Sequence, residues 1–139
     1  MSYSLREKCI LALAVGAGLM DGLTGCLLLA APAFALRLMG VPPIDPEALV
    51  FIRYIGAFVF SIGTLYFYAA LRVQRRRDWK AFRMIFGVTA WVRAVICFFT
   101  LNAILSGGLD VAWWSVPVSD GSLALLQAWL VLAGWIRKD

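Results

Sequence analysis

The chain has 139 residues, of which 63% are hydrophobic and only 15% charged, with a mean hydropathy of +0.85 and a net charge of +5. Soluble domains carry about a quarter charged residues, which excludes that class. The apolar residues come in blocks of the length, about 20 residues, that a helix needs to cross a bilayer, whereas a β-barrel would need short alternating segments. We therefore predict an all-α polytopic membrane protein, an antiparallel four-helix transmembrane bundle that forms a single domain over residues 1–139.

The first membrane span is predicted over about residues 9–31. Its apolar run is longer than the roughly 7–15 residues of a signal-peptide core, so we expect this span to be retained. The segment from Pro32 to Gly40 is too short to cross a membrane. Because proline suits the first turn of a helix and glycine its end, we expect a short interfacial helix there.

The second span is predicted over about residues 48–71. Asp45 is expected to cap it, with Pro46 in the first turn and Glu47 close to the positive end of the helix dipole. Capping at this point follows a proline-rich link that cannot be helical throughout.

The third span is predicted over about residues 81–105 and ends at a Ser-Gly-Gly sequence that is typical of a helix C-terminus. The fourth is predicted over about residues 119–136, with Ser119 or Asp120 as its cap. These two spans complete a bundle of four neighbours joined by short connections.

Basic residues lie before the first span, between the second and third, and after the fourth, whereas the other two connections are mainly acidic. Positive charge of this kind marks the cytoplasmic side. We predict a multi-pass protein of the cell (inner) membrane with cytoplasmic N- and C-termini. Membrane lipid is an expected partner, and nucleic acid is not.

Three charges interrupt the apolar spans, namely Asp21, Arg53 and Arg93. Asp21 and Arg93 each lie about twelve residues, roughly 18 Å, from the cytoplasmic start of their spans. Each shares its helix face with small residues, which predicts that the two side chains face inward and meet. Arg53 is expected one to two turns closer to the outer side, and Gln127 near the midplane. With Tyr54, which follows Arg53, these residues form the predicted ligand site.

Two interpretations of these charges stay open. In the first, Asp21 and Arg93 form an ion pair that sets helix register, and Arg53 extends to the outer interface. In the second, two arginines against one aspartate leave a net positive pocket. Such a pocket would bind an amphiphile with an acidic head, or a quinone-like acceptor.

The chain contains no histidine, and its three cysteines lie far apart. Histidine is the usual haem ligand and the commonest metal ligand and general base. No paired cysteine motif indicates a disulfide or redox site. We therefore predict no metal, no cofactor and no catalytic residue.

The first half of the chain combines a glycine-rich first span, the helix-Pro-helix-Gly pattern of residues 31–40, and the sequence Phe-Ile-Arg-Tyr-Ile-Gly-Ala of residues 51–57. In these features it resembles the DoxX-like superfamily of small four-helix membrane proteins. The resemblance implies the four-helix fold. Members of the superfamily have heterogeneous roles, so it implies no single activity and no catalytic residue.

The first functional prediction is a non-catalytic membrane protein, either an accessory subunit or a binder of a small lipophilic or anionic amphiphile at Asp21, Arg53 and Arg93. The alternative is an intramembrane enzyme or quinone-linked redox subunit, with Asp21 as acid or base. A small transporter is the third. A membrane-protein partner or a homo-oligomer, with Gly16 and Gly22 at the contact, is also expected.

Overall fold

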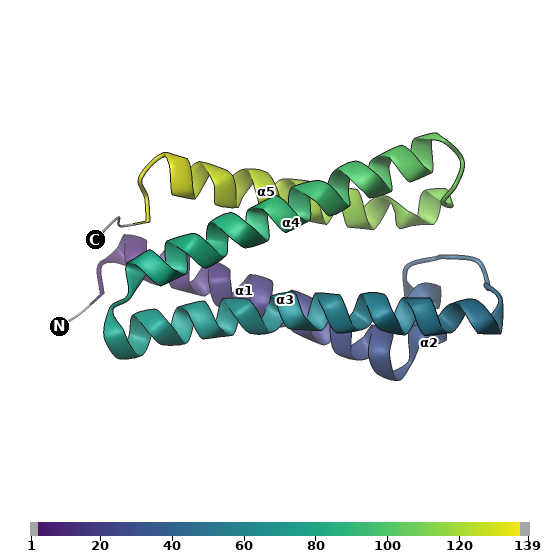
Figure 1. Cartoon of the computed structure of the whole chain (residues 1–139), viewed down its shortest axis with the longest axis horizontal. Helices are drawn as coiled ribbons and strands as arrows, with labels where there is room; N and C mark the ends of the chain where they lie inside the picture. The colour runs from purple at the N-terminus through teal and green to yellow at the C-terminus, as the bar shows by residue number, and fades with distance from the viewer. Residues whose placement is uncertain (1–2, 137–139) are drawn as a thin grey trace.

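The computed structural model describes residues 3–136, and its regular structure in that range is entirely helical. Four long helices pack antiparallel, and a short helix, α2 (Pro32–Leu38), follows the first of them (Figure 1). This arrangement confirms the predicted all-α bundle and its short helix after the first span. All four long helices are long and apolar enough to cross a membrane, so the chain is a polytopic membrane protein. They are α1 (Leu5–Ala30), α3 (Leu49–Arg76), α4 (Trp79–Leu105) and α5 (Ser115–Leu132).

Side-chain caps begin several of the helices. Ser4 and Glu7 form a reciprocal capping box at the start of α1. The carboxylate of Asp45 accepts from the backbone N–H of Glu47 at 3.0 Å and opens a 3-10 turn, Pro46–Ala48, that leads into α3. The predicted cap at Asp45 is therefore confirmed.

Two connections, the one after α2 and the one after α4, each contain a glycine in the left-handed backbone conformation. Gly40 follows α2 with φ of 76°, and Gly107 follows α4 with φ of 75°. Glycine adopts this conformation without the steric cost that a Cβ atom imposes. Both positions confirm the helix ends that the sequence predicts.

The last helix begins earlier than predicted. Asp110 caps a 3-10 turn, Val111–Trp114, and α5 continues directly from it at Ser115. Pro117 lies in the first turn of α5, where its missing N–H costs no hydrogen bond. The expected cap at Ser119 or Asp120 is therefore wrong, and Asp120 lies more than a turn inside the helix.

Helices α1 and α3 approach so closely that their backbones touch through glycine. A Cβ atom added at Gly63 would lie 2.6 Å from the backbone nitrogen of Gly22. One added at Gly25 would collide with the backbone of Phe60. Small residues at such crossings allow membrane helices to pack at van der Waals distance. The glycine face predicted on the first span thus packs on α3 within the same chain.

Helices α4 and α5 form the second close pair. A Cβ atom added at Gly121 would lie 3.0 Å from the sulfur of Cys97. The two pairs join mainly where α3 packs on α4, and the described part of α1 makes no close backbone approach to α4 or α5. The bundle is therefore two tight helix pairs, and side chains must fill the space between them.

Two apolar cores stabilise the bundle, one toward each end. The larger lies near the α3–α4 turn and includes Tyr66, Phe82 and Phe86, which are fully buried. The smaller lies under α2 and includes Leu36 and Ile52. A layer of polar side chains separates the two cores, and it contains the candidate site.

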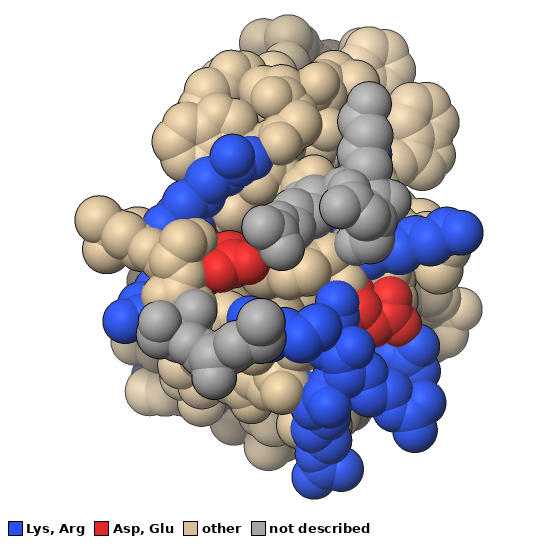
Figure 2. Space-filling view, turned by 90° about the vertical axis from the view of Figure 1, so that its left-hand side faces the viewer, with Lys and Arg blue, Asp and Glu red and all other residues tan. Residues whose placement is uncertain are grey.

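The outer surface is apolar along the helices and basic at one end. Phe98, Phe99, Leu125 and Leu132 are each at least 69% exposed, as expected for side chains that face lipid. Arginine and lysine side chains gather at the end that holds the start of α1 and the α3–α4 turn (Figure 2). This separation of apolar walls from a basic end is typical of a membrane protein.

Candidate functional site

Arg93 of α4 is the centre of the polar layer, and its side chain is only 3% exposed. Its Nη2 atom pairs with the carboxylate of Asp21 on α1, and its Nη1 atom pairs with that of Asp120 on α5. Its Nε atom donates to the hydroxyl of Tyr66 on α3 at 3.0 Å. One guanidinium therefore joins side chains from all four spanning helices.

The predicted meeting of Asp21 and Arg93 is confirmed, and both residues are buried. The physical reason is simple. Both helices are unbroken and run from the same basic end, so equal residue counts give equal depths at about 1.5 Å per residue. Asp21 lies on the α1 face that also carries Ala14, Ala17 and Gly25, all buried.

Asp120 is the member of the network that the sequence reasoning missed. It was placed at the cap of the last span, whereas it lies inside α5 with its carboxylate on Arg93. One signal was available: Asp120 and Gln127 are seven residues apart, so both lie on one helix face. A polar face on an otherwise apolar span indicates burial inside the bundle.

Tyr66 and Gln127 extend the network between α3 and α5. Both are fully buried, and the Gln127 side-chain amide donates to the Tyr66 hydroxyl. The amide oxygen of Gln127 is buried without a hydrogen-bond partner within the described chain. Gln127 was predicted near the midplane, and it lies one contact away from Arg93. Tyr66 supplies the hydroxyl that links the two helix pairs.

Arg53 does not join this network. It lies thirteen residues before Tyr66 on α3, roughly 20 Å along the helix. Its Nη1 atom donates to the carbonyl of Leu29, one of the terminal carbonyls of α1 that lack a partner within the helix. Tyr54 is 64% exposed and packs edge-on against Phe58, with ring centroids 5.0 Å apart. The expected grouping of Arg53 and Tyr54 with Asp21 is therefore not what the fold produces.

The polar layer was expected to carry a net positive charge, and its residues give a net negative one. Two aspartates face one arginine, so the layer carries an excess of negative charge when all three groups are ionised. All three nitrogen atoms of Arg93 already donate to protein oxygens. The predicted net positive pocket is wrong at this place, because Arg53 is absent from it and Asp120 is present.

The chemistry open to this layer is that of carboxylates held by a guanidinium. Carboxylates buried inside membrane spans serve proton relays as well as structural ion pairs, so both uses are open to this layer. No group of three or more Asp, Glu, Cys or His residues within residues 3–136 is arranged to hold a metal ion. A ligand-binding role for Asp21, Arg93 and Gln127 stays a prediction.

Comparison of the chain with protein-family models, curated proteins and solved structures finds no match. The chain is a small four-span membrane protein with a buried Asp21–Arg93–Asp120 network.

Proposed function

We propose that the chain is a non-catalytic accessory subunit of a membrane-protein assembly, and that its polar layer has a structural role. One observation carries the proposal: each nitrogen of Arg93 donates to a side chain of a different spanning helix. A carboxylate or phosphate ligand binds a guanidinium through two neighbouring N–H groups, and each such pair on Arg93 already has a donor engaged with the protein. This counts against the binding of an anionic amphiphile at Arg93. The role we assign to Arg93 is to link the α1–α3 pair to the α4–α5 pair.

The DoxX-like superfamily, which the first half of the chain resembles, includes accessory membrane proteins as well as quinone-linked oxidoreductase subunits, so the resemblance allows this role without singling it out. We extend the proposal to placement in the cell (inner) membrane, with the basic end of the bundle on the cytoplasmic side. Its support is the gathering of arginine and lysine at that end (Figure 2). The exposed apolar faces of the four helices would contact lipid and the partner protein.

The proposal is tested by native mass spectrometry of the chain released directly from membranes. The expected result is a stoichiometric complex with a second membrane protein. The matched variant Asp21→Leu/Arg93→Met/Asp120→Leu replaces the ionic layer with apolar side chains, an exchange that is often neutral for stability. We expect this variant to retain the complex.

Two results would contradict the proposal. One is a chain found alone with a retained lipophilic molecule that the triple variant loses, because the polar layer would then be a ligand site. The other is loss of the complex in a folded triple variant. If the triple variant does not fold, Asp120→Asn, which retains the Asp21–Arg93 pair, serves in its place.

A second function is favoured by one specific observation, the presence of Asp120. A small proton-coupled transporter needs a membrane carboxylate that exchanges its proton, and Arg93 would keep Asp21 as its counter-ion while Asp120 did so. Proton-driven uptake into liposomes that is lost in Asp120→Asn would establish this function. Equal proton flux in empty and protein-containing liposomes, over a panel of solutes, would exclude it.

A further inference from the structure

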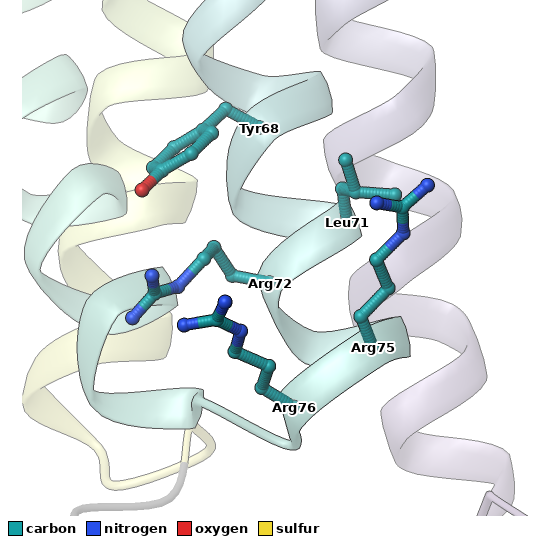
Figure 3. Close-up of a pocket in the computed structure, with 5 residues that line it drawn as sticks. All are labelled: Tyr68, Leu71, Arg72, Arg75 and Arg76. Carbon is teal, nitrogen blue, oxygen red and sulfur yellow. The ribbon is translucent and has the colours of Figure 1, made fainter.

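A cavity of about 280 Å³ opens on the outward face of α3, close to the basic end of the bundle. It is lined by side chains of that helix alone (Figure 3). This cavity lies away from the polar layer around Arg93 and has no part in the proposed function. The lining residues are Tyr68, Leu71, Arg72, Arg75 and Arg76.

The spacing of these residues places them on one stripe of the helix. They stand at i, i+3, i+4, i+7 and i+8, so they follow one another along a single face. Along this stripe the chemistry changes from aromatic and aliphatic to basic as α3 approaches its last turn. Tyr68 and Leu71 are 51% and 41% exposed, in continuity with the lipid-facing wall. The stripe thus matches the change from acyl chain to headgroup to water.

The three arginines of the cavity differ in how they are held. The Nε atom of Arg72 donates to the Asp78 carboxylate at 3.0 Å, and its guanidinium carbon lies 5.9 Å from the Tyr68 ring centroid. Arg75 and Arg76 are exposed and donate no hydrogen bond within residues 3–136, and Arg76 lies close enough to Asp78 to help lower the pKa of that carboxyl. In Figure 3, Arg72 and Arg76 reach to the same side of α3, and Arg75 lies along Leu71. Two guanidinium groups at the rim are therefore open to an external anion.

The local charge favours such an anion strongly. Residues 72–83 contain six basic side chains and one acidic one, Asp78, which Arg72 already holds. Guanidinium groups match the geometry of phosphate oxygens, and juxtamembrane arginines attract anionic lipid headgroups. An aromatic hydroxyl such as that of Tyr68 suits the headgroup level of a bilayer.

We propose that this cavity binds an anionic phospholipid in the leaflet at the basic end, with Arg76, on the side of Arg72, at the phosphate and Arg75, on the side of Leu71, at the edge of the headgroup. Arg72, oriented by Asp78, forms the inner wall. Leu71 and Tyr68 contact the glycerol and the first part of the acyl chains. A lipid fits better than a soluble phosphate compound because the cavity opens onto an apolar helix face.

The test is lipid titration of the purified full chain in detergent, read by native mass spectrometry. The probes are phosphatidylglycerol, which is anionic, and phosphatidylcholine, which is zwitterionic, with matched acyl chains. We expect the wild-type chain to retain phosphatidylglycerol preferentially. We expect Arg75→Gln/Arg76→Gln to weaken that binding about thirtyfold, since each arginine near an anionic lipid contributes about one factor of five.

The matched control is Lys8→Gln/Lys80→Gln, which removes the same charge from the basic end at exposed positions that do not line the cavity. Because neither lysine lines the cavity, it should retain phosphatidylglycerol within about twofold of wild type. An equal loss in both variants would overturn the site in favour of diffuse charge attraction. Unchanged binding in the arginine variant would also overturn it.

Inorganic phosphate, added as a competitor, separates a lipid from a soluble phosphate. The proposal predicts no displacement of phosphatidylglycerol at equal concentration, and displacement would overturn the assignment to a lipid. Circular dichroism and the unfolding temperature report on the fold of each variant. If the double variant unfolds, the single variant Arg75→Gln is judged by the same criteria.

Discussion

Asp21 on α1 and Arg93 on α4 form a buried ion pair between two helices whose backbones do not approach each other closely. The pair therefore crosses the space between the two tight helix pairs. Asp120 and Tyr66 meet the same guanidinium from α5 and α3. This geometry makes Arg93 the point at which the four-span bundle is joined.

Asp21 and Asp120 should each be able to serve as the counter-ion of Arg93 when the other is removed. Either Asp21→Asn or Asp120→Asn leaves Arg93 with one carboxylate, so we expect each single variant to cost about 1 kcal/mol or less. The double variant leaves a buried arginine without a counter-ion, and we expect a loss of about 3–5 kcal/mol. Unfolding in lipid or detergent micelles, followed by tryptophan fluorescence, measures all three. Losses that simply add would mean that the two carboxylates act independently.

Tyr66 should contribute through its hydroxyl. Tyr66→Phe retains the ring packing on Phe86 and removes the oxygen that accepts from Arg93 and Gln127. Two buried donors then lose their acceptor, and we expect a loss of about 1–3 kcal/mol in unfolding free energy. Tyr68→Phe, at an exposed position on the same helix, is the matched control and should change little. Equal effects of the two substitutions would show that the hydroxyl of Tyr66 has no special role.

The contact between α1 and α3 should be sensitive to a single methyl group. Gly63→Ala brings a Cβ atom against the backbone of Gly22, and the helices must separate. We expect a loss of about 1–3 kcal/mol from this overpacking. Gly87→Ala, whose Cβ atom would meet nothing within 4 Å, should be neutral or stabilising by up to about 1 kcal/mol. Thermal unfolding of both variants checks the contrast, which fails if Gly63→Ala is tolerated as well as Gly87→Ala.

The turn between α3 and α4 should give the protein an acid-sensitive contribution. The backbone N–H of Ala81 and then the Arg72 guanidinium lower the pKa of the Asp78 carboxyl. A carboxyl with a lowered pKa in the folded state stabilises fully above its unfolded pKa of about 3.9, and the contribution is lost as the pH falls through the folded value. Asp78→Asn should therefore be less stable than wild type near neutral pH, and the difference should shrink below about pH 4. A constant difference from pH 7 to pH 3 would contradict this.

The helical architecture follows from the sequence because each signal is local. Long apolar blocks, the cap at Asp45 and the glycines at Gly40 and Gly107 each act within a few residues. The pairing of Asp21 with Arg93 was also predictable, since a regular helix converts residue number into depth. These inferences needed no knowledge of how the helices pack.

The rest of the site depends on packing that residue counts do not contain. Asp120 was missed because the last span was predicted to begin at about residue 119, whereas α5 begins at Ser115. Arg53 was included because residue counts place it only one to two turns from Asp21 and Arg93, yet its side chain reaches the end of α1, where the Leu29 carbonyl accepts from it. Together the two errors reversed the sign of the predicted charge, because leaving out Arg53 removes one positive charge and including Asp120 adds one negative charge.

The most direct test of the central claim is a double-mutant cycle between Asp21 and Arg93. The variants are Asp21→Asn, Arg93→Met and their combination. The control is the same cycle with Asp110→Asn in place of Asp21→Asn, because Asp110 is an exposed residue that caps the 3-10 turn Val111–Trp114. We predict a coupling free energy of at least about 1 kcal/mol for Asp21 with Arg93 and none for Asp110 with Arg93. Strictly additive losses for Asp21 and Arg93 would contradict the role of this arginine as the link between the helix pairs.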